Sequence, residues 1–160
     1  MLHHPEGLSG LILSGPAVKV SDAVSPVTIE ISKILSRIFP KAGIIKLESA
    51  KISRDPDVVA AQEKDPLVHH QKISARLGAE MLVAMENLQT DAGRIILPLL
   101  ILQGGADEMV DPSGAQLLLD LVGSTDRTLK IYDGMYHEVF NELEHDRVLD
   151  DLQRWLEAHQ

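Results

Sequence analysis

Two residues in the second half of the chain could do chemistry together: Asp107 and His137. Each follows an apolar run that ends in a glycine turn, because the run 97–102 leads to Asp107 and the run 128–132 leads to His137. In α/β sheets, reactive groups collect outside the carboxyl ends of the strands. A carboxylate that fixes the imidazole tautomer and a histidine that moves a proton are two members of a nucleophile–His–acid triad.

The pattern alone leaves alternatives open for both residues. Glu108 and Asp111 compete with Asp107 for the role of the acid. Asp111 precedes a proline and suits a helix N-cap, so a structural role explains it, whereas Glu108 is expected to face solvent. His137 could equally be a surface histidine or a hydrogen-bonded core histidine.

Hydrophobic periodicity predicts the elements that must position these residues. The continuous apolar run 97–102 is typical of a central parallel strand that is buried on both faces. Asn141, with Glu144 three residues later, predicts a capping box at the start of the last helix. The expected strands are 8–13, 97–102 and 128–132; the expected helices are 26–39, 73–88, 111–122 and one from 141 onward, with 40–56 as loop and 56–63 as short turns.

Length and composition exclude several classes of protein. The 160 residues suffice for one domain with a core of its own. A net charge of −9 argues against nucleic-acid binding, and the absence of cysteine excludes disulfides and a cysteine nucleophile. The first residues do not read as a signal peptide, and no apolar run approaches the ~18 residues that a membrane span needs, so a cytoplasmic location is expected.

No cofactor or metal is expected either. His69 and His70 are adjacent, so their side chains cannot share one face of a helix or strand. The sequence contains no H-E-x-x-H, paired C-x-x-C or EF-hand spacing.

Several longer segments together resemble one known family. They are HPEGLSGLILSGPA, DPLVHHQKISARLGAEML, LILQGGADEMVDP and LKIYDGMYHEVFNE. In this order and spacing, they are similar to the C-terminal portion of an α/β-hydrolase of the monoacylglycerol lipase or lysophospholipase type, the serine aminopeptidase S33 group. The resemblance selects Asp107 as the triad acid and His137 as the triad histidine.

The resemblance also implies an architecture. Residues 1–160 would form a single, partial α/β-hydrolase domain, with about three parallel strands and flanking helices, and residues 17–92 would be an inserted helical cap. In the family, apolar cap residues line an acyl-chain tunnel, and Met81 and Met85 would suit a pliable lipid surface. From periodicity alone, the same residues are ordinary core.

The third triad member is missing from the sequence. The family's serine sits in a G-x-S-x-G element, and the chain contains none; Ser9 and Ser14 are the nearest serines and neither matches. By resemblance, the serine and the oxyanion loop would precede Met1, so the chain alone is expected to be inactive. Its first strand would then be an exposed edge that favours self-association.

The implied function is that of a carboxylic ester hydrolase acting on a small lipid ester, with contact between the cap and a membrane surface. Three alternatives stay open. The chain could belong to another α/β-hydrolase, such as a peptidase or a short-chain esterase. It could be a catalytically inactive relative that binds a lipid or another small molecule, or a small-molecule binder unrelated to hydrolases.

Overall fold

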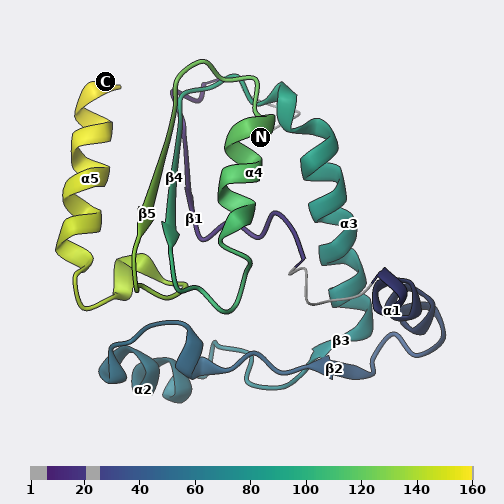
Figure 1. Cartoon of the computed structure of the whole chain (residues 1–160). Coiled ribbons are helices and arrows are strands. Elements are labelled where there is room, and N and C mark those ends of the chain that lie inside the picture. Colours follow the sequence, from purple (N-terminus) through teal and green to yellow (C-terminus); the bar gives the residue numbers. More distant parts are fainter. Residues whose placement is uncertain (1–6, 21–25, 160) are drawn as a thin grey trace.

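A parallel three-stranded sheet forms the centre of the molecule (Figure 1). The computed structural model describes residues 7–20 and 26–159. The strands β1 (Leu11–Ser14), β4 (Leu99–Gly104) and β5 (Arg127–Tyr132) lie in the order β1-β4-β5. The predicted α/β class with three parallel strands is confirmed, although β1 begins three residues later than expected.

The remaining elements lie between and after these strands along the chain. Those before β4 are α1 (Pro26–Ile38), β2 (Gly43–Ile45), η1 (Ser49–Lys51), α2 (Pro56–Lys64), β3 (Ile73–Ser74), α3 (Ala75–Asp91) and η2 (Ala92–Arg94). Those after β4 are α4 (Ser113–Leu121), η3 (Val139–Asn141) and α5 (His145–Ala158).

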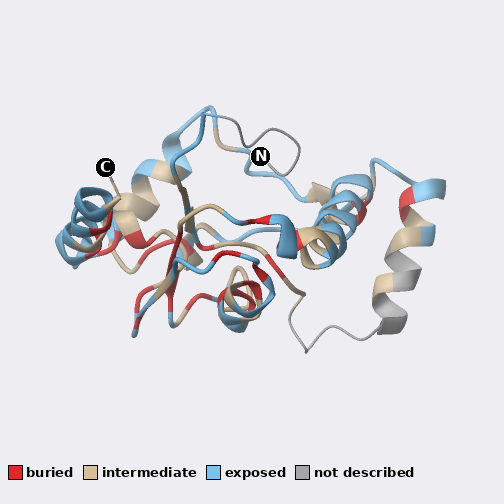
Figure 2. Cartoon of the chain, turned by 90° about the horizontal axis from the view of Figure 1, so that it is seen from above, coloured by how far each residue is buried: buried red, intermediate tan, exposed pale blue. Residues whose placement is uncertain are grey.

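The central strand β4 is buried on both faces, as its apolar run predicts. Leu99 and Ile101 pack into a cluster with α4 and the end of α3, whereas Leu100 and Leu102 pack into a second cluster with α5. Every residue of β4 is buried. Figure 2 shows the same concentration of buried residues in the sheet and along the helices that face it.

Residues 26–94, here called the outer region, lie mainly to one side of the sheet. Figure 1 shows β2, β3 and α2 beneath the carboxyl ends of the parallel strands, while α3 runs upward along the side of α4. The helix α1 packs on α3, and the Lys33 ammonium lies 3.1 Å from the Glu86 carboxylate between them. The carboxyl edge of the sheet therefore faces the outer region.

The segment 40–56 differs from the loop that its lack of periodicity predicts. It contains β2, which pairs antiparallel with β3, and the short helix η1. Strands of three and two residues are too short to show alternation, and their pairing joins distant parts of the chain. The helix α2 is also more regular than the expected turns, because Asp55 accepts a hydrogen bond from the Asp57 amide and Pro56 begins the helix.

The helices α5 and α3 each differ from the sequence prediction. The helix α5 begins at His145, and its N-cap makes no side-chain cap hydrogen bond, so the capping box expected from Asn141 is wrong. On α3, Leu77 and Met81 are 49% and 41% exposed, so they are not core residues. Within the described ranges, no helix is long and apolar enough to cross a bilayer.

Candidate active site

The carboxylate of Asp107 sits in a turn that directly follows β4. Its Oδ1 atom accepts hydrogen bonds from the backbone amides of Met109, at 2.8 Å, and Val110, at 3.1 Å. The side chain is completely buried. The turn therefore fixes one carboxylate oxygen and leaves Oδ2 to face the neighbouring loop.

His137 lies on the loop that follows β5, next to that carboxylate. The loop turns at Gly134, which has a φ of 78°, a conformation that glycine adopts without strain. The Nδ1 atom of His137 lies 2.8 Å from Oδ2 of Asp107. Because an ionised carboxylate only accepts hydrogen bonds, Nδ1 carries the proton, and Nε2 remains able to accept one from another group. The imidazole is 26% exposed.

The contact shifts the pKa of both groups in directions that favour a charged pair. Burial opposes ionisation of Asp107 most strongly, but the hydrogen bonds from His137 and from the two turn amides together outweigh burial and lower its pKa. The hydrogen bond to Asp107 raises the pKa of His137, more than burial lowers it. The site thus stabilises the imidazolium that forms whenever His137 takes up a proton.

Gln103 is a third member of this arrangement that the sequence reasoning missed. Its side-chain amide donates to Oδ2 of Asp107, at 3.0 Å, and to the carbonyl of Gly104, at 3.1 Å. The residue is fully buried, and its Oε1 atom has no hydrogen-bond partner within the described parts of the chain. A polar side chain directly after the predicted buried run 97–102 was the available signal, because buried polar groups are normally hydrogen-bonded.

Two glycines allow the loops to approach one another. Gly15 has a φ of 53°, and a Cβ added there would lie 3.0 Å from the Nδ1 and Cε1 atoms of His137. A Cβ on Gly104 would lie 1.9 Å from the carbonyl oxygen of Tyr136. The ends of β1 and β4 therefore both press against the loop that carries His137.

The competing carboxylates have other partners. Glu108 is exposed and pairs with Lys51 at 3.2 Å. Asp111 accepts from the Ser113 amide at 2.9 Å and pairs with Lys19 at 3.3 Å. The first of these bonds lies in the turn before α4, which begins at Ser113 with Pro112 as its N-cap and no side-chain cap hydrogen bond, so the predicted role of Asp111 as the helix N-cap is wrong.

The other candidate residues lie outside this pair. His69 and His70 are exposed, and His70 contacts the backbone carbonyl of Asp65 at 3.1 Å. Ser9 and Ser14 are both exposed. In residues 7–20 and 26–159, no group of three or more histidines and carboxylates could hold a metal ion.

Two cavities lie near the pair, and neither is lined by Asp107 or His137. One, of about 610 Å³, lies between η1 and α2 and is lined in part by Ile52, Val68 and Met109. The other, of about 480 Å³, is lined in part by Arg54 and Tyr136. Each cavity therefore contacts a residue that lies one or two positions from the acid or the histidine.

A family model and individual relatives match nearly the whole chain and point to the same family. The family described as "Serine aminopeptidase, S33" matches residues 1–144. The monoacylglycerol lipase of Mycolicibacterium smegmatis is 40% identical over 156 residues, which cover 98% of this chain and 56% of that protein. The human monoglyceride lipase is 30% identical over 156 residues, which cover 95% of this chain and 51% of that protein.

Solved structures agree with the fold. The monoacylglycerol lipase of Paleococcus ferrophilus superposes with a TM-score of 0.86 at 32% identity, over 99% of this chain and 62% of that one. A soluble variant of the Saccharomyces cerevisiae monoglyceride lipase, in complex with a substrate analogue, gives a TM-score of 0.79 at 25% identity, over 95% of this chain and 56% of that one. The chain thus spans about half the length of the curated relatives it matches. From its sequence and its fold, the chain belongs to the serine aminopeptidase S33 family of α/β-hydrolases, with monoacylglycerol lipases among its relatives.

Proposed function

We propose that this chain supplies the acid and the histidine of a serine ester hydrolase of the monoacylglycerol lipase type. The observation that supports the proposal is the 2.8 Å contact between Nδ1 of His137 and the buried Oδ2 of Asp107. Both residues follow the carboxyl ends of neighbouring parallel strands, where α/β folds place their reactive groups.

In the proposed reaction, a serine hydroxyl attacks the ester carbonyl while Nε2 of His137 takes the hydroxyl proton. The carboxylate of Asp107 stabilises the imidazolium, which then gives its proton to the departing alcohol. Water attacks the acyl-enzyme in the second half of the reaction and loses a proton to His137. The imidazolium then returns this proton to the serine oxygen as the acyl–oxygen bond breaks, which releases the fatty acid and restores the serine hydroxyl.

The proposal places the serine on a segment outside these 160 residues. The sequence contains no G-x-S-x-G element, and Ser9 and Ser14 do not fit that pattern. The relatives are nearly twice as long as the matched region, which supports this assignment. By the same proposal, the lone chain has no ester hydrolase activity, because the covalent route needs the nucleophile.

The proposal also assigns residues 17–92 as a cap over the site and a small lipid ester as the substrate. The position of β2, β3 and α2 beneath the carboxyl edge supports the cap (Figure 1). One cavity is lined both by residues of α2 and by Met109, which lies two residues after the proposed acid. The proposed cap therefore borders a cavity that reaches the loop of Asp107. A relative of known structure binds a substrate analogue, which supports a lipid ester as the substrate.

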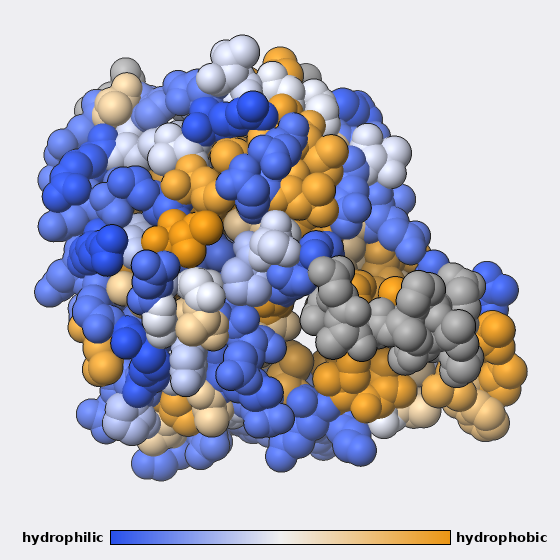
Figure 3. Space-filling model, in the orientation of Figure 1, coloured by the Kyte–Doolittle hydropathy of each residue, from blue (hydrophilic) through white to orange (hydrophobic). Residues whose placement is uncertain are grey.

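Two kinds of contact with partners belong to the same proposal. Apolar side chains that are more than half exposed gather at the end of α1, directly after it and on β2, among them Ile38, Phe39 and Ile45. Figure 3 shows apolar surface at the lower right, where Figure 1 places these elements. Such a surface suits transient contact with a lipid surface.

The edge of β1, where Ile12 is 36% exposed, suits self-association. Light scattering of the parent and of Ile12→Lys tests the second contact: a parent that is monomeric at all concentrations would contradict it.

The function can be tested by joining the chain to the part of the Mycolicibacterium smegmatis relative that it does not cover. We expect the fusion to hydrolyse a monoacylglycerol and Asp107→Asn to lose activity on the order of 10³–10⁴-fold, because the imidazole loses the partner that sets its tautomer. His137→Ala should be at least as severe. Glu108→Gln is the matched control, since it neutralises the adjacent carboxylate, and it should retain activity. An active fusion that tolerates Asp107→Asn would refute the assignment.

A catalytically inactive binding protein is the second candidate, favoured by the absence of a G-x-S-x-G element from the sequence together with the two cavities. A fluorophosphonate probe read by intact mass addresses the chain itself. We expect no adduct. An adduct that disappears in His137→Ala would mean that another hydroxyl of this chain has been recruited. Saturable binding of a monoacylglycerol without turnover by the fusion would favour the binding protein over the hydrolase.

A further inference from the structure

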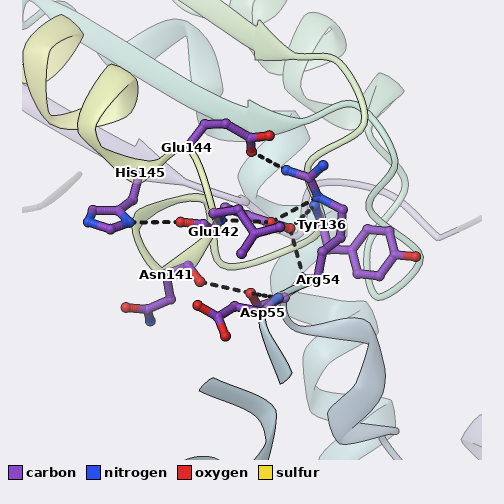
Figure 4. A network of polar contacts seen from close by, with 9 residues as sticks. Arg54, Asp55, Tyr136, Asn141, Glu142, Glu144 and His145 are labelled. Carbon is purple, nitrogen blue, oxygen red and sulfur yellow. Dashed lines mark hydrogen bonds and ion pairs between the residues drawn. The ribbon is translucent and has the colours of Figure 1, made fainter. Parts of the chain in front are cut away.

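Glu142 is a carboxylate in the interior of the molecule that the proposed chemistry does not use. Its side chain is completely buried. One oxygen, Oε1, accepts hydrogen bonds from the backbone amides of Tyr136, at 2.7 Å, and Arg54, at 3.2 Å. The other oxygen, Oε2, lies 2.9 Å from Nε of Arg54 and 3.3 Å from the amide of Leu143. Figure 4 shows the carboxylate of Glu142 between Arg54 and the loop of Tyr136.

This network holds the backbone on both sides of His137. The residue before it, Tyr136, donates its amide to Glu142. The residue after it, Glu138, donates its amide to the carbonyl of Ile52, at 2.8 Å. The outer region therefore bonds directly to Glu138 through Ile52. It is linked to Tyr136 indirectly, because Arg54 and Tyr136 both bond to the carboxylate of Glu142.

Ser53, which follows Ile52, adds a contact near the end of the loop that carries His137. The Ser53 hydroxyl donates to the carbonyl of Asn141 at 2.7 Å and accepts from the Asp55 amide at 2.9 Å. Three successive residues, 52 to 54, thus bond to the segment 133–144 between β5 and α5, here called the histidine loop. Arg54 also pairs with Glu144, whose side chain is largely exposed and has no hydrogen bond to the loop backbone between 136 and 139 in the described part of the chain.

We propose that Glu142 and Arg54 are positioning residues that couple the outer region to His137. The segment 52–54 then sets where the His137 backbone lies, and so whether the imidazole reaches Asp107. This inference rests on the proposed function only in that His137 is taken as the catalytic histidine. A movement of the outer region at this segment would separate the Asp107–His137 pair without touching either side chain.

Removing the charge of Glu142 should be the most damaging change to this coupling. In Glu142→Gln, the amide that replaces one oxygen must face donors, namely Nε of Arg54 and the backbone amides around it, so at least one donor loses its acceptor. Arg54→Lys is milder, because the ammonium keeps the charge but cannot reproduce the fixed geometry of the guanidinium. Ser53→Ala is the mildest, since it removes one contact at the end of the loop.

The test is proton NMR of the purified 160-residue chain with ¹⁵N-labelled histidine, at a pH where the imidazole is protonated. The hydrogen-bonded Nδ1 proton of His137 should give a far-downfield signal, and Asp107→Asn should abolish it, which assigns it. We expect Glu142→Gln to lose or broaden this signal and to increase hydrogen exchange at the Tyr136 amide by about tenfold or more. Arg54→Lys should show a smaller change in the same direction.

Two matched controls separate positioning from general stability. Glu144→Gln removes the exposed partner of Arg54, and Arg76→Lys repeats the arginine substitution at the exposed Arg76–Glu80 pair on α3. Both should keep the downfield signal. If Glu142→Gln does not fold, the His137 signal and the Tyr136 exchange of Arg54→Lys decide whether the coupling exists.

The outcomes distinguish this inference from the proposed function. A folded Glu142→Gln or Arg54→Lys chain whose His137 signal and Tyr136 exchange match the parent would overturn the coupling and leave the Asp107–His137 pair intact. A parent chain without any downfield signal sensitive to Asp107→Asn would instead overturn the pair itself, and with it the geometric support for the proposed function.

Discussion

The sheet and the outer region are stabilised in different ways. In β4, every residue is buried, and alternate side chains enter two apolar clusters. In α2, no residue is buried, and the outer region leaves Ile38, Phe39 and Leu67 more than half exposed. Burial of apolar surface therefore fixes the sheet, whereas the outer region joins it through the apolar end of α3 and a few polar contacts, such as those of Arg54. The two regions should respond very differently to equivalent substitutions.

The largest difference is expected between two glycines. In Gly104→Ala, the new methyl group would lie 1.9 Å from a backbone oxygen of the His137 loop, so the loop or the strand must move. We expect a loss of about 3 kcal/mol or more in the free energy of unfolding. Gly93→Ala, next to the end of α3, meets nothing closer than 3.9 Å and should change stability by less than about 1 kcal/mol. Urea unfolding measures both, and equal effects would contradict the close approach.

Truncating apolar side chains should give the next largest difference. Leu100 is 1% exposed and lies in the cluster with α5, so Leu100→Ala should cost about 2–5 kcal/mol through lost burial and a new cavity. Leu67 is 92% exposed, and Leu67→Ala should stay within about 0.5 kcal/mol of the parent. A substantial loss at Leu67 would show that the outer region buries this side chain in solution.

The Asp107–His137 pair should make stability depend on pH. Because Asp107 raises the pKa of His137, the pair adds stability below the ordinary histidine pKa of about 6.5, and this part is lost as the pH rises through the raised value. The lowered pKa of Asp107 adds stability above its ordinary range, which is lost as the pH falls through the lowered value. Asp107→Asn should abolish both dependences.

Unfolding free energies measured from about pH 3 to pH 9 would show these dependences as the difference between the parent and Asp107→Asn. His69→Gln is the matched control, because it removes an exposed histidine of the outer region. Parent and Asp107→Asn curves that run parallel throughout would contradict a pair with shifted pKa values.

The smallest effect is expected for an exposed ion pair of the outer region. Arg76 and Glu80 lie 2.7 Å apart on α3, with side chains 63% and 55% exposed. Arg76→Ala should lower the free energy of unfolding by less than about 0.5 kcal/mol, and salt should reduce the difference further. A larger loss in a thermal or urea melt would mean that exposed charges stabilise the outer region more than its few buried contacts do.

The same contrast explains how much of the molecule the sequence predicts. The apolar run at β4 predicts a strand buried on both faces, because burial leaves a continuous pattern in neighbouring residues. The turns after β4 and β5 also indicate where Asp107 and His137 lie. Both predictions concern the sheet, where local composition carries the information.

The polar contacts that join the regions leave no such pattern. Glu142 looks like part of a helix start in the sequence, yet its carboxylate binds the backbone of Arg54, far away along the chain. The last helix begins only at His145, three residues after Glu142. The pairing of β2 with β3 is hidden for the same reason, since two or three residues are too few to show alternation. The catalytic roles of Asp107 and His137 stay predictions.

The parallel sheet also has a consequence for the order in which the chain folds. The unit β4-α4-β5 joins strands that are close in the sequence, and its crossover closes a short loop. Pairing of β1 with β4, by contrast, must close a loop that contains the whole outer region. Because non-local pairing carries a larger entropic cost and slows folding, we expect β4-α4-β5 to form the nucleus, β1 to join later and the contacts of Arg54 to form last. The histidine loop would then gain its final position only after the outer region has docked.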